Sequence, residues 1–329
     1  MNAVELNKVS KSYRKDFWAK KISAVSDLSF TVKRERVTGF VGPNGAGKTT
    51  TIKMIMGLVF PESGSIKIYN RDYGFPSSRK GVAYLSEQPY FYGHLTVVES
   101  LRFISELIGL NRSVISKEIE RVLAVVELSG KAGSRIKELS KGMQQRLNMA
   151  QVLLGDPHML ILDEPMSGMD PPGRRLFRKL FSELAAKGKT IFFSSHVLED
   201  IEAVCDDVVV LSKGKLAFSG EIESILEKGF LGTEMIVSLL TPDDLLFLRG
   251  LDCEVTELDK GTFSLFVPRG GNPGQVQNLL FSKGIEVLSI VRRTLPLEEL
   301  LYRNDGDQEE NKAEIRRQEI SGRGAECKP

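Results

Sequence analysis

The sequence is poor in the features that mark secreted, membrane-spanning or nucleic-acid-binding chains. Its 329 residues contain three cysteines, Cys205, Cys253 and Cys327, whose scattered positions favour reduced thiols in a cytosolic compartment over a disulfide framework or a zinc site. No apolar run approaches the roughly 20 residues that span a bilayer, and the first residues lack the apolar stretch of a signal peptide. The 45 lysines and arginines are almost balanced by 43 aspartates and glutamates, so no nucleic-acid partner is expected.

The chain does contain enough apolar material for a packed core, since 41% of its residues are hydrophobic, and its length predicts two domains. Up to about residue 229, apolar runs of strand length alternate with helical periodicity, which is the pattern of an α/β domain with parallel strands. Within this region, Thr96–Gly130 has apolar residues at helical spacing. We therefore predict a helical insert at about residues 90–157.

The pattern changes after Gly229. Strand-like runs at 234–240, 253–258, 262–267 and 285–291, with helical stretches at 243–248 and 273–283, have the order β-α-β-β-α-β of a ferredoxin-like unit. The residues after 303 are rich in charge and offer almost nothing to a core. We therefore predict a first domain over 1–229, a small α+β domain over 230–303, and a charged, disordered tail over 304–329.

A glycine-rich segment lies between a predicted strand, Val37–Val41, and a predicted helix over 50–56. It contains Gly42, Pro43, Asn44, Gly45, Ala46, Gly47, Lys48 and Thr49, which match the P-loop pattern G-x-x-x-x-G-K-[ST]. Glycines let backbone N–H groups converge on phosphates, Lys48 neutralises the β and γ oxygens, and Thr49 can bind Mg²⁺. A chance glycine-rich turn is the alternative. We predict that the residues from Gly42 to Thr50 bind ATP or GTP.

A second apolar strand, Met159–Leu162, ends in two carboxylates. Asp163 would emerge at the carboxyl end of a parallel strand, where open α/β sheets bind ligands, and would hold Mg²⁺ through water. Glu164 is placed to orient or deprotonate the attacking water in a phosphoryl transfer. An acidic pair that caps a helix is the alternative, but the P-loop upstream favours the catalytic interpretation.

With these motifs, residues 4–220 resemble the nucleotide-binding domain of ATP-binding cassette (ABC) proteins. Leu139–Arg146 is similar to the family's signature, Leu-Ser-Gly-Gly-Gln, although Lys141 and Met143 replace the usual Gly and Gln. Ser140 is a good N-cap, so a helix N-terminus would face outward toward an anion. In the family this anion is the γ-phosphate of an ATP bound by a second subunit, which implies cofactor-binding roles for Ser140 and Gly142. An ordinary capped helix is the alternative.

The resemblance also implies roles for four further segments, which follow one another in the family's order. Gln88 is similar to the glutamine that contacts Mg²⁺ and the attacking water, and His196 is similar to the histidine that contacts the γ-phosphate. Tyr13 resembles the aromatic residue on which adenine stacks. Ser167–Asp170 resembles the loop that crosses the dimer interface. Each of these residues alone could equally have a structural role.

The resemblance thus implies a P-loop NTPase core of the ABC ATPase type that hydrolyses ATP with Mg²⁺. Its catalytic residues would be Glu164, His196 and Gln88, and its metal-binding residues would be Thr49, Gln88 and Asp163. One chain carries one set of motifs, so a homodimer, or a heterodimer with a related nucleotide-binding subunit, is expected. Opening and closing of the pair would be the motion through which ATP hydrolysis does work.

We expect the ATP-hydrolysing subunit of a membrane transporter, peripheral on the cytoplasmic face of the cell membrane, with separate membrane-spanning permease subunits. The alternative is a soluble mechanochemical ABC ATPase, but Lys48 and Asp163 are too close in the sequence for the long coiled coils of repair-type members. The P-loop, Leu139–Arg146 and the ending Leu295–Leu301 resemble ABC-2 type exporters, a group that moves drugs, antibiotics, polysaccharides, lipids or sodium. An importer is the alternative within transporters.

Two regions have less specific interpretations. Tyr90–Tyr92 follows Gln88 and is a candidate to line the groove that receives a helix of the membrane partner, although packing inside the helical insert is an equal alternative. The C-terminal unit contains no nucleophile, metal cluster or glycine-rich loop, and we expect it to have a dimerising or regulatory role.

Overall fold

The computed structural model describes residues 1–14, 18, 21–238, 240–241, 244–245, 248, 253–259 and 261–302. The chain forms two compact units, a first over Met1–Ile222 and a second from Glu223 onward. The division precedes the expected boundary at 229 because helix α7 (Ile222–Lys228) contacts the second unit, where Arg269 Nη1 donates to the Lys228 carbonyl at 3.2 Å. The predicted tail, 304–329, lies outside the described residues.

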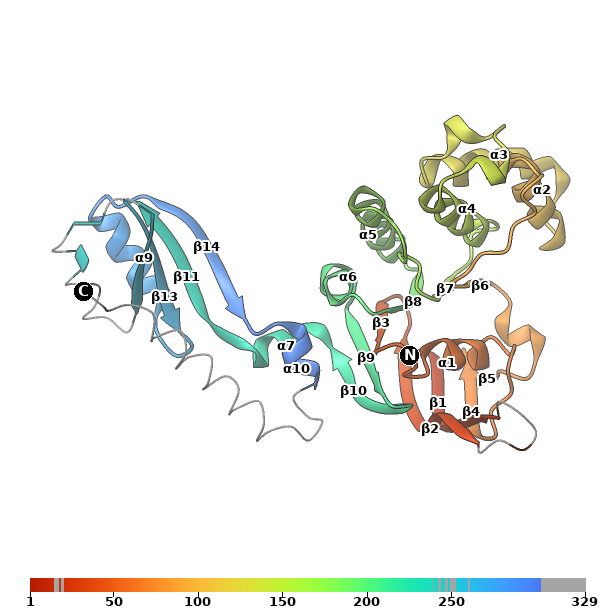
Figure 1. The fold of residues 1–329 in the computed structure, drawn as a ribbon, viewed down its shortest axis with the longest axis horizontal. Coiled ribbons are helices and arrows are strands. Elements are labelled where there is room, and N and C mark those ends of the chain that lie inside the picture. The colour runs from red at the N-terminus through yellow and green to blue at the C-terminus, as the bar shows by residue number, and fades with distance from the viewer. Residues whose placement is uncertain are drawn as a thin grey trace. The chain divides into compact units, whose positions relative to one another are not determined.

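The first unit is organised around a six-stranded sheet with the order β10-β9-β3-β8-β7-β6 (Figure 1). Its strands are β3 (Val37–Val41), β6 (Val82–Leu85), β7 (Met159–Leu162), β8 (Thr190–Ser195), β9 (Asp207–Ser212) and β10 (Lys215–Glu221). All neighbours pair in parallel except β10, which is antiparallel to β9. The two predicted strands, β3 and β7, are therefore confirmed and flank β8, so that their carboxyl ends meet at one edge of the sheet.

A second, antiparallel sheet in this unit has the order β2-β1-β4-β5. Its strands are β1 (Asn2–Tyr13), β2 (Ile22–Lys33), β4 (Ser63–Ile68) and β5 (Arg71–Asp72). Phe30 from this sheet packs on Phe40 and Phe192 of the parallel sheet, with ring centroids 5.6 and 5.9 Å away. Helix α1 (Lys48–Ile55) buries Ile52 and Ile55 in the same core. The loop that precedes α1 is thus anchored to this buried core.

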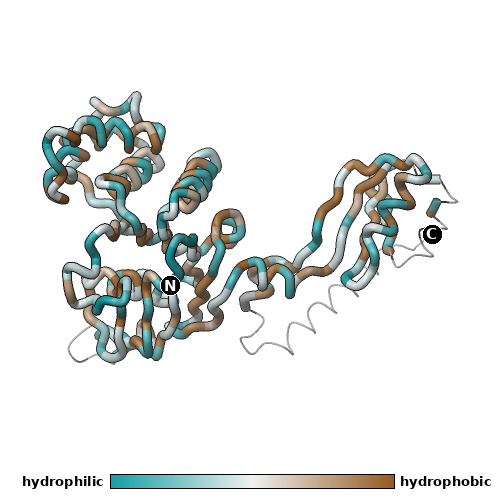
Figure 2. Tube along the Cα trace, turned by 180° about the vertical axis from the view of Figure 1, so that it is seen from behind, coloured by the Kyte–Doolittle hydropathy of each residue, from teal (hydrophilic) through white to brown (hydrophobic). Residues whose placement is uncertain are grey.

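The remaining helices of this unit are α2 (Val97–Leu107), α3 (Arg112–Val125), α4 (Lys141–Leu153), α5 (Pro171–Ala186) and α6 (Leu198–Val204). Short 3₁₀ turns occur at Pro76–Arg79, Ser129–Lys131 and Ile136–Glu138. Helices α2, α3 and α4 gather beside the edge strand β6 (Figure 1), as the helical pattern in the sequence predicts. Their hydrophobic and hydrophilic residues alternate along the tube (Figure 2), because each helix buries one face.

The second unit contains an antiparallel sheet with the order β12-β13-β11-β14. Its elements are β11 (Phe230–Ser238), β12 (Glu254–Asp259), β13 (Thr262–Pro268), α9 (Pro273–Ser282), β14 (Val287–Thr294) and α10 (Leu297–Tyr302). Apolar residues of β11, β13 and α9 form its core, among them Met235, Leu265 and Leu280. The first strand lies between the third and the fourth, which is the ferredoxin-like order predicted. In the predicted helix over 243–248, the described residues 244, 245 and 248 are helical and the others lie outside the described part.

Candidate nucleotide-binding site

The P-loop follows β3 and leads into α1, as its motif requires. A Cβ atom on Gly42 would lie 2.5 Å from the carbonyl oxygen of Leu211. Gly47 has a φ of +102°, and a Cβ there would lie 2.5 Å from the carbonyl oxygen of Ala24. Glycine is therefore required at both positions, by the space available at Gly42 and by space and backbone conformation together at Gly47.

The Lys48 ammonium lies between the P-loop and the end of strand β7. Its Nζ donates to the Gly42 carbonyl at 2.6 Å and lies 3.5 Å from Oε1 of Glu164. Both side chains are buried, so the pair is poorly screened by solvent. The lysine is thus held where it can neutralise phosphate oxygens that lie against the loop.

Ser194, near the end of β8, connects the Asp163 carboxylate with the backbone of Glu164. Its Oγ donates to Oδ1 of Asp163 at 2.7 Å and accepts from the backbone N–H of Glu164 at 2.8 Å. Asp163 is buried, and this burial, together with the charge of Glu164, raises the pKa of its carboxyl group, while the hydroxyls of Ser194 and Thr49 oppose the shift. Among the described residues, Oδ2 of Asp163 has no hydrogen-bond partner.

Glu164 and His196 face each other across the carboxyl ends of β7 and β8. Nδ1 of His196 lies 2.9 Å from Oε2 of Glu164. Glu164 has a φ of +48°, in the left-handed region that residues with side chains rarely adopt. Such a conformation persists only where the surroundings hold it, here through the hydrogen bond to Ser194. The backbone therefore turns the carboxylate toward the cavity at the edge of the sheet.

This cavity has a volume of about 580 Å³, which is ample for a small-molecule ligand. It is lined by Tyr13, Ala24, the residues from Pro43 to Thr50, Glu87, Glu164, Ser167 and His196. The fold thus gathers Tyr13, most of the P-loop, Glu164 and His196 around one space. The ammonium of Lys11 lies 5.6 Å from the ring centroid of Tyr13, so the ring already contacts a cation.

The structure does not bring every predicted site residue to this cavity. Gln88 is exposed and is not among the lining residues, while its neighbour Glu87 is. Ser140 and Gly142 lie at the start of α4, also outside the cavity. Ser140 caps the helix by accepting from the Met143 N–H at 3.3 Å, and a Cβ on Gly142 would meet nothing within 4 Å. The surface at the start of α4 is thus open toward whatever approaches the chain.

Sequence reasoning missed three polar residues that connect the site. Ser194 is one of two adjacent serines, and only the pairing of β7 with β8 identifies the one that reaches Asp163. Gln145 of α4 donates to the Pro165 carbonyl at 2.7 Å, and Asn148 of the same helix donates to the Ser86 carbonyl at 3.3 Å. No signal in the sequence separates these amides from surface residues.

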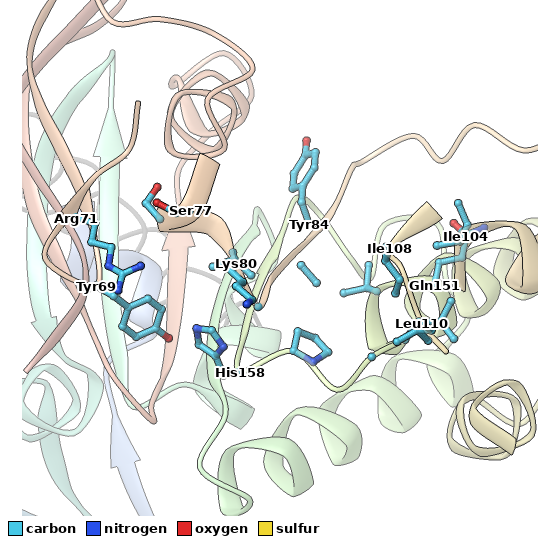
Figure 3. Close-up of a pocket in the computed structure, with 18 of the residues that line it drawn as sticks. Tyr69, Arg71, Ser77, Lys80, Tyr84, Ile104, Ile108, Leu110, Gln151 and His158 are labelled. Carbon is cyan, nitrogen blue, oxygen red and sulfur yellow. The ribbon is translucent and has the colours of Figure 1, made fainter. Parts of the chain in front are cut away.

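A second cavity of about 1040 Å³ lies in the same unit, beside the edge strand β6. Figure 3 shows its two walls: Tyr69, Arg71, Ser77, Lys80 and His158 on one side, and Ile104, Ile108, Leu110 and Gln151 on the other. One wall is thus basic and polar, and the other is mostly apolar. Burial raises the pKa of Tyr84, which also lines the cavity, to about 12.

A phosphate-binding loop beside two carboxylates, all at the carboxyl ends of parallel strands, defines the class of P-loop nucleotide hydrolases. Within that class, residues 25–167 match the family described as ABC transporter. The chain belongs to this family. It is an ATP-binding, ATP-hydrolysing subunit of the ABC transporter type.

Several relatives resemble the chain over much of its length. The bacitracin transport ATP-binding protein BcrA of Bacillus licheniformis is 33% identical over 84% of this chain and 90% of its own length. A Nod factor export ATP-binding protein I of Rhizobium etli is 31% identical over 93% of this chain and 94% of its own. An ABC transporter ATP-binding protein of Synechocystis is 39% identical, and the match spans 64% of that relative's length.

Solved structures agree on the fold. The ATP-binding subunit of an ABC transporter has a TM-score of 0.60 and 30% identity, over 69% of this chain and 92% of that one. A dimeric cassette bound to ADP and phosphate in a post-hydrolysis state has a TM-score of 0.61 over 67% of this chain and 98% of that one. At 21% identity, this second likeness concerns the fold alone.

Proposed function

We propose that this chain is the ATP-hydrolysing subunit of an exporter and that it works as a pair of nucleotide-binding subunits on separate membrane-spanning subunits. The observation that carries the proposal is the match to a Nod factor export protein over 93% of this chain, since a match of that extent includes the second unit as well as the nucleotide-binding one. A position at the cytoplasmic face of the membrane follows from this role. None of the described helices is both long and apolar enough to cross a membrane.

The donor set at the end of β7 fits Mg²⁺. Asp163 offers a buried carboxylate oxygen without a hydrogen-bond partner among the described residues, and the Thr49 hydroxyl lies beside the same carboxylate. Oxygen donors of this kind are what Mg²⁺ prefers, usually together with water and substrate phosphates. The ion, when bound, would neutralise charge on the phosphate oxygens. Gln88 would have to swing from its exposed position to join this set.

The catalytic step that fits the site is attack of water on the γ-phosphorus of ATP. The bond from this phosphorus to the oxygen of ADP breaks, and the proton of the water passes to Glu164. His196 and Lys48 contact opposite oxygens of that carboxylate, at 2.9 and 3.5 Å, and so fix its direction. Lys48 and the N–H groups of the P-loop stabilise the negative charge on the transferred group.

The pairing of two nucleotide-binding subunits is supported by the exposed start of α4. Ser140 and Gly142 are not among the residues that line the nucleotide cavity of their own chain, yet they offer N–H groups and a hydroxyl suited to an anion. In a symmetric pair, α4 of one chain would close the cavity of the other. Each ATP would then be bound by the P-loop of one subunit and by Ser140 of its partner.

An exposed apolar strip next to the second cavity supports docking of a membrane-spanning subunit. Tyr90 is 86% exposed, Tyr92 51%, Phe103 43% and Leu107 65%. Tyr92 packs edge-on against Tyr90 and Phe103, with centroids 5.9 and 6.2 Å away. Aromatic side chains that remain this exposed favour a partner surface over packing inside the helical insert.

The charges of the second cavity suggest what the partner presents. Arg71 and Lys80 lie on one wall, whereas the α2 wall is apolar. Arg34 also lines the cavity, with its guanidinium carbon 4.6 Å from the ring centroid of Tyr69. An amphipathic helix that carries carboxylates on its polar side would be complementary to both walls.

The proposal is tested by expressing tagged Glu164→Gln protein in its native cells, solubilising the membranes gently with ATP present, and identifying the co-purified proteins by mass spectrometry. Removal of the base should hold ATP and keep the complex closed. We expect a polytopic membrane protein. Recovery of only ribosomal or DNA-associated proteins, with the tagged chain absent from membranes, would refute the transporter assignment and favour a soluble mechanochemical ATPase.

Two single substitutions locate the docking surface in the same experiment. Tyr92→Ala should release the chain from the membrane protein while leaving its fold intact. Phe281→Ala is the matched control, because this aromatic residue is also exposed, at 63%, but lies on α9 of the second unit. Equal retention of both variants would exclude Tyr92 from the interface, and insolubility of the first alone would show that Tyr92 serves packing.

A further inference from the structure

A cluster of charges around one buried carboxylate joins helices α5 and α6. Asp200 of α6 is 0% exposed. Its Oδ2 accepts from Nη1 of Arg174 at 3.0 Å, and its Oδ1 accepts from Nε of Arg178 at 2.9 Å. Both arginines belong to α5, one turn apart, so a single carboxylate connects the two helices through both of its oxygens. We call these three residues the arginine clamp.

The clamp is a poor device for stability alone. Moving the Asp200 carboxylate out of water, together with the larger part of two arginine side chains that stay 24% and 31% exposed, is costly. Apolar side chains of similar size often give equal or greater stability at such positions. What the clamp does provide is a fixed position of α6 relative to α5. A carboxylate held by two directed N–H donors allows little sliding of one helix along the other.

Each of the two clamped helices follows, along the chain, one residue of the contact between Glu164 and His196. Glu164 begins a tight turn, in which the Ser167 N–H donates to its carbonyl at 3.1 Å, and the loop ends at Asp170, the N-cap of α5. His196 directly follows strand β8, and α6 begins two residues later at Leu198. The base therefore leads into α5, and the histidine leads into α6.

Helix α6 also lies unusually close to the parallel sheet. A Cβ atom on Gly39 of β3 would be 2.7 Å from Cδ1 of Ile201, the neighbour of Asp200. The sheet therefore limits movement of α6 from one side while the clamp holds it to α5 on another. Movement of the loop over Ser167–Asp170 would reach His196 through these packed elements.

We propose that the arginine clamp is a positioning device that holds His196 against Glu164 and passes displacements of the Ser167–Asp170 loop to this pair. The inference rests on the proposed function, because it takes Glu164 as the base. Arg174, Arg178 and Asp200 are positioning residues and contact neither nucleotide nor water in this role.

The test separates positioning from stability by removing the whole clamp. The variant Arg174→Met, Arg178→Met, Asp200→Leu leaves no buried charge without a partner, so it should fold even where a single Asp200→Asn substitution does not. We expect its kcat for ATP hydrolysis to fall about 100-fold, as for a small misplacement of catalytic groups. Its KM for ATP should stay within about threefold of the wild type, because the P-loop is unchanged.

Two controls accompany this variant. Lys179→Met removes an exposed ion pair of the same helix, whose partners are 3.8 Å apart, and should leave kcat unchanged. Arg178→Lys keeps the charge but loses the forked donor geometry, so its kcat should lie between those of the wild type and the triple variant.

The inference is overturned if the triple variant folds and keeps kcat within about threefold of the wild type, or if kcat and KM worsen together. His196→Ala in the same assay separates this failure from failure of the proposed function. If His196→Ala also leaves kcat unchanged, the catalytic assignment itself is wrong. If it lowers kcat while the triple variant does not, only the clamp inference fails.

Discussion

At the scale of single residues, the site depends on side chains that serve two partners at once. Ser194 donates to Asp163 and accepts from the backbone of Glu164, so one hydroxyl holds the Asp163 carboxylate and the Glu164 backbone together. Glu164 in turn receives His196 on one oxygen and Lys48 on the other. Each contact restricts the position of the next side chain. Loss of the Ser194 hydroxyl should therefore disturb the site by more than the loss of a single hydrogen bond would.

Ser194→Ala should reduce ATP hydrolysis about 10- to 100-fold, as expected when a residue that orients a metal-binding carboxylate is lost. The substitution also leaves the Glu164 N–H unpaired in a buried position. Steady-state kinetics with Mg²⁺ and ATP measure the effect. Ser182→Ala, on an exposed part of α5, is the control. Full activity of Ser194→Ala would show that the two carboxylates hold their positions without it.

Asp163→Asn should abolish hydrolysis and yet stabilise the nucleotide-free protein at pH 7–8. Burial raises the pKa of Asp163 in the folded state, so ionisation at neutral pH opposes folding. The gain is the free energy of ionising a carboxyl group whose folded-state pKa is raised, and the size of that shift sets it. Below the ordinary pKa of about 3.9, both folded and unfolded wild type are protonated, and the difference should vanish.

Thermal unfolding with a chelator present, at pH 8, 6 and 4.5, measures whether Asp163→Asn is more stable than the wild type and how this difference depends on pH. The advantage of Asp163→Asn should shrink as the pH falls toward the range where the wild-type carboxyl group is protonated. An equal or lower melting temperature of the variant at pH 8 would contradict the argument that the buried charge is costly.

At the scale of elements, the stability of the helical insert depends on the N-terminal capping of its helices. Thr96 and Glu99 form a capping box on α2: the Glu99 N–H donates to the Thr96 hydroxyl at 3.2 Å, and the Thr96 N–H donates to the Glu99 carboxylate at 2.8 Å. These hydrogen bonds lower the pKa of Glu99. The same helix presents Phe103 and Leu107 at the proposed docking surface, so its start sets the position of that surface.

Thr96→Ala should destabilise the first unit by about 1 kcal/mol, because an N–H at the start of α2 loses its acceptor. Urea unfolding followed by circular dichroism measures the change. Ser116→Ala, an exposed substitution within α3, should shift the transition by less. An unchanged midpoint for Thr96→Ala would mean that packing alone holds α2 in place.

At the scale of the whole molecule, the proposed nucleotide site draws on two surfaces that lie apart within one chain. The cavity beside the P-loop and the exposed start of α4 belong to the same unit, but no residue of the signature segment lines that cavity. Two chains in a symmetric arrangement would make two complete sites, each with Lys48 from one chain and Ser140 from the other.

This division predicts complementation between two inactive chains. Lys48→Ala and Ser140→Arg should each abolish hydrolysis alone. Mixed in equal amounts, they should recover about a quarter of the wild-type rate, because half of the pairs are hybrids with one intact site each. Hydrolysis of the mixture under saturating ATP measures this recovery. A mixture as inactive as its components would contradict a site shared between two copies of this chain.

Much of this arrangement is already determined by the sequence, because the relevant interactions are local. The P-loop pattern, the apolar strand before Asp163 and the N-cap at Ser140 each depend on residues a few positions apart, and they appear in the structure where the patterns predict them. The alternation of periodicities also predicted the α/β unit and the succession of strands and helices along the second unit.

Contacts between residues far apart in the chain were decided only by the tertiary structure. The pairing of β7 with β8 brings Ser194 to Asp163, and the packing of α5 on α6 brings Arg174 and Arg178 to Asp200. Gln88 remained exposed although its motif predicted a ligand. The local sequence around a serine or a charged residue is the same whether its side chain faces water or a distant partner. Only the packing of the whole unit determines which of the two it meets.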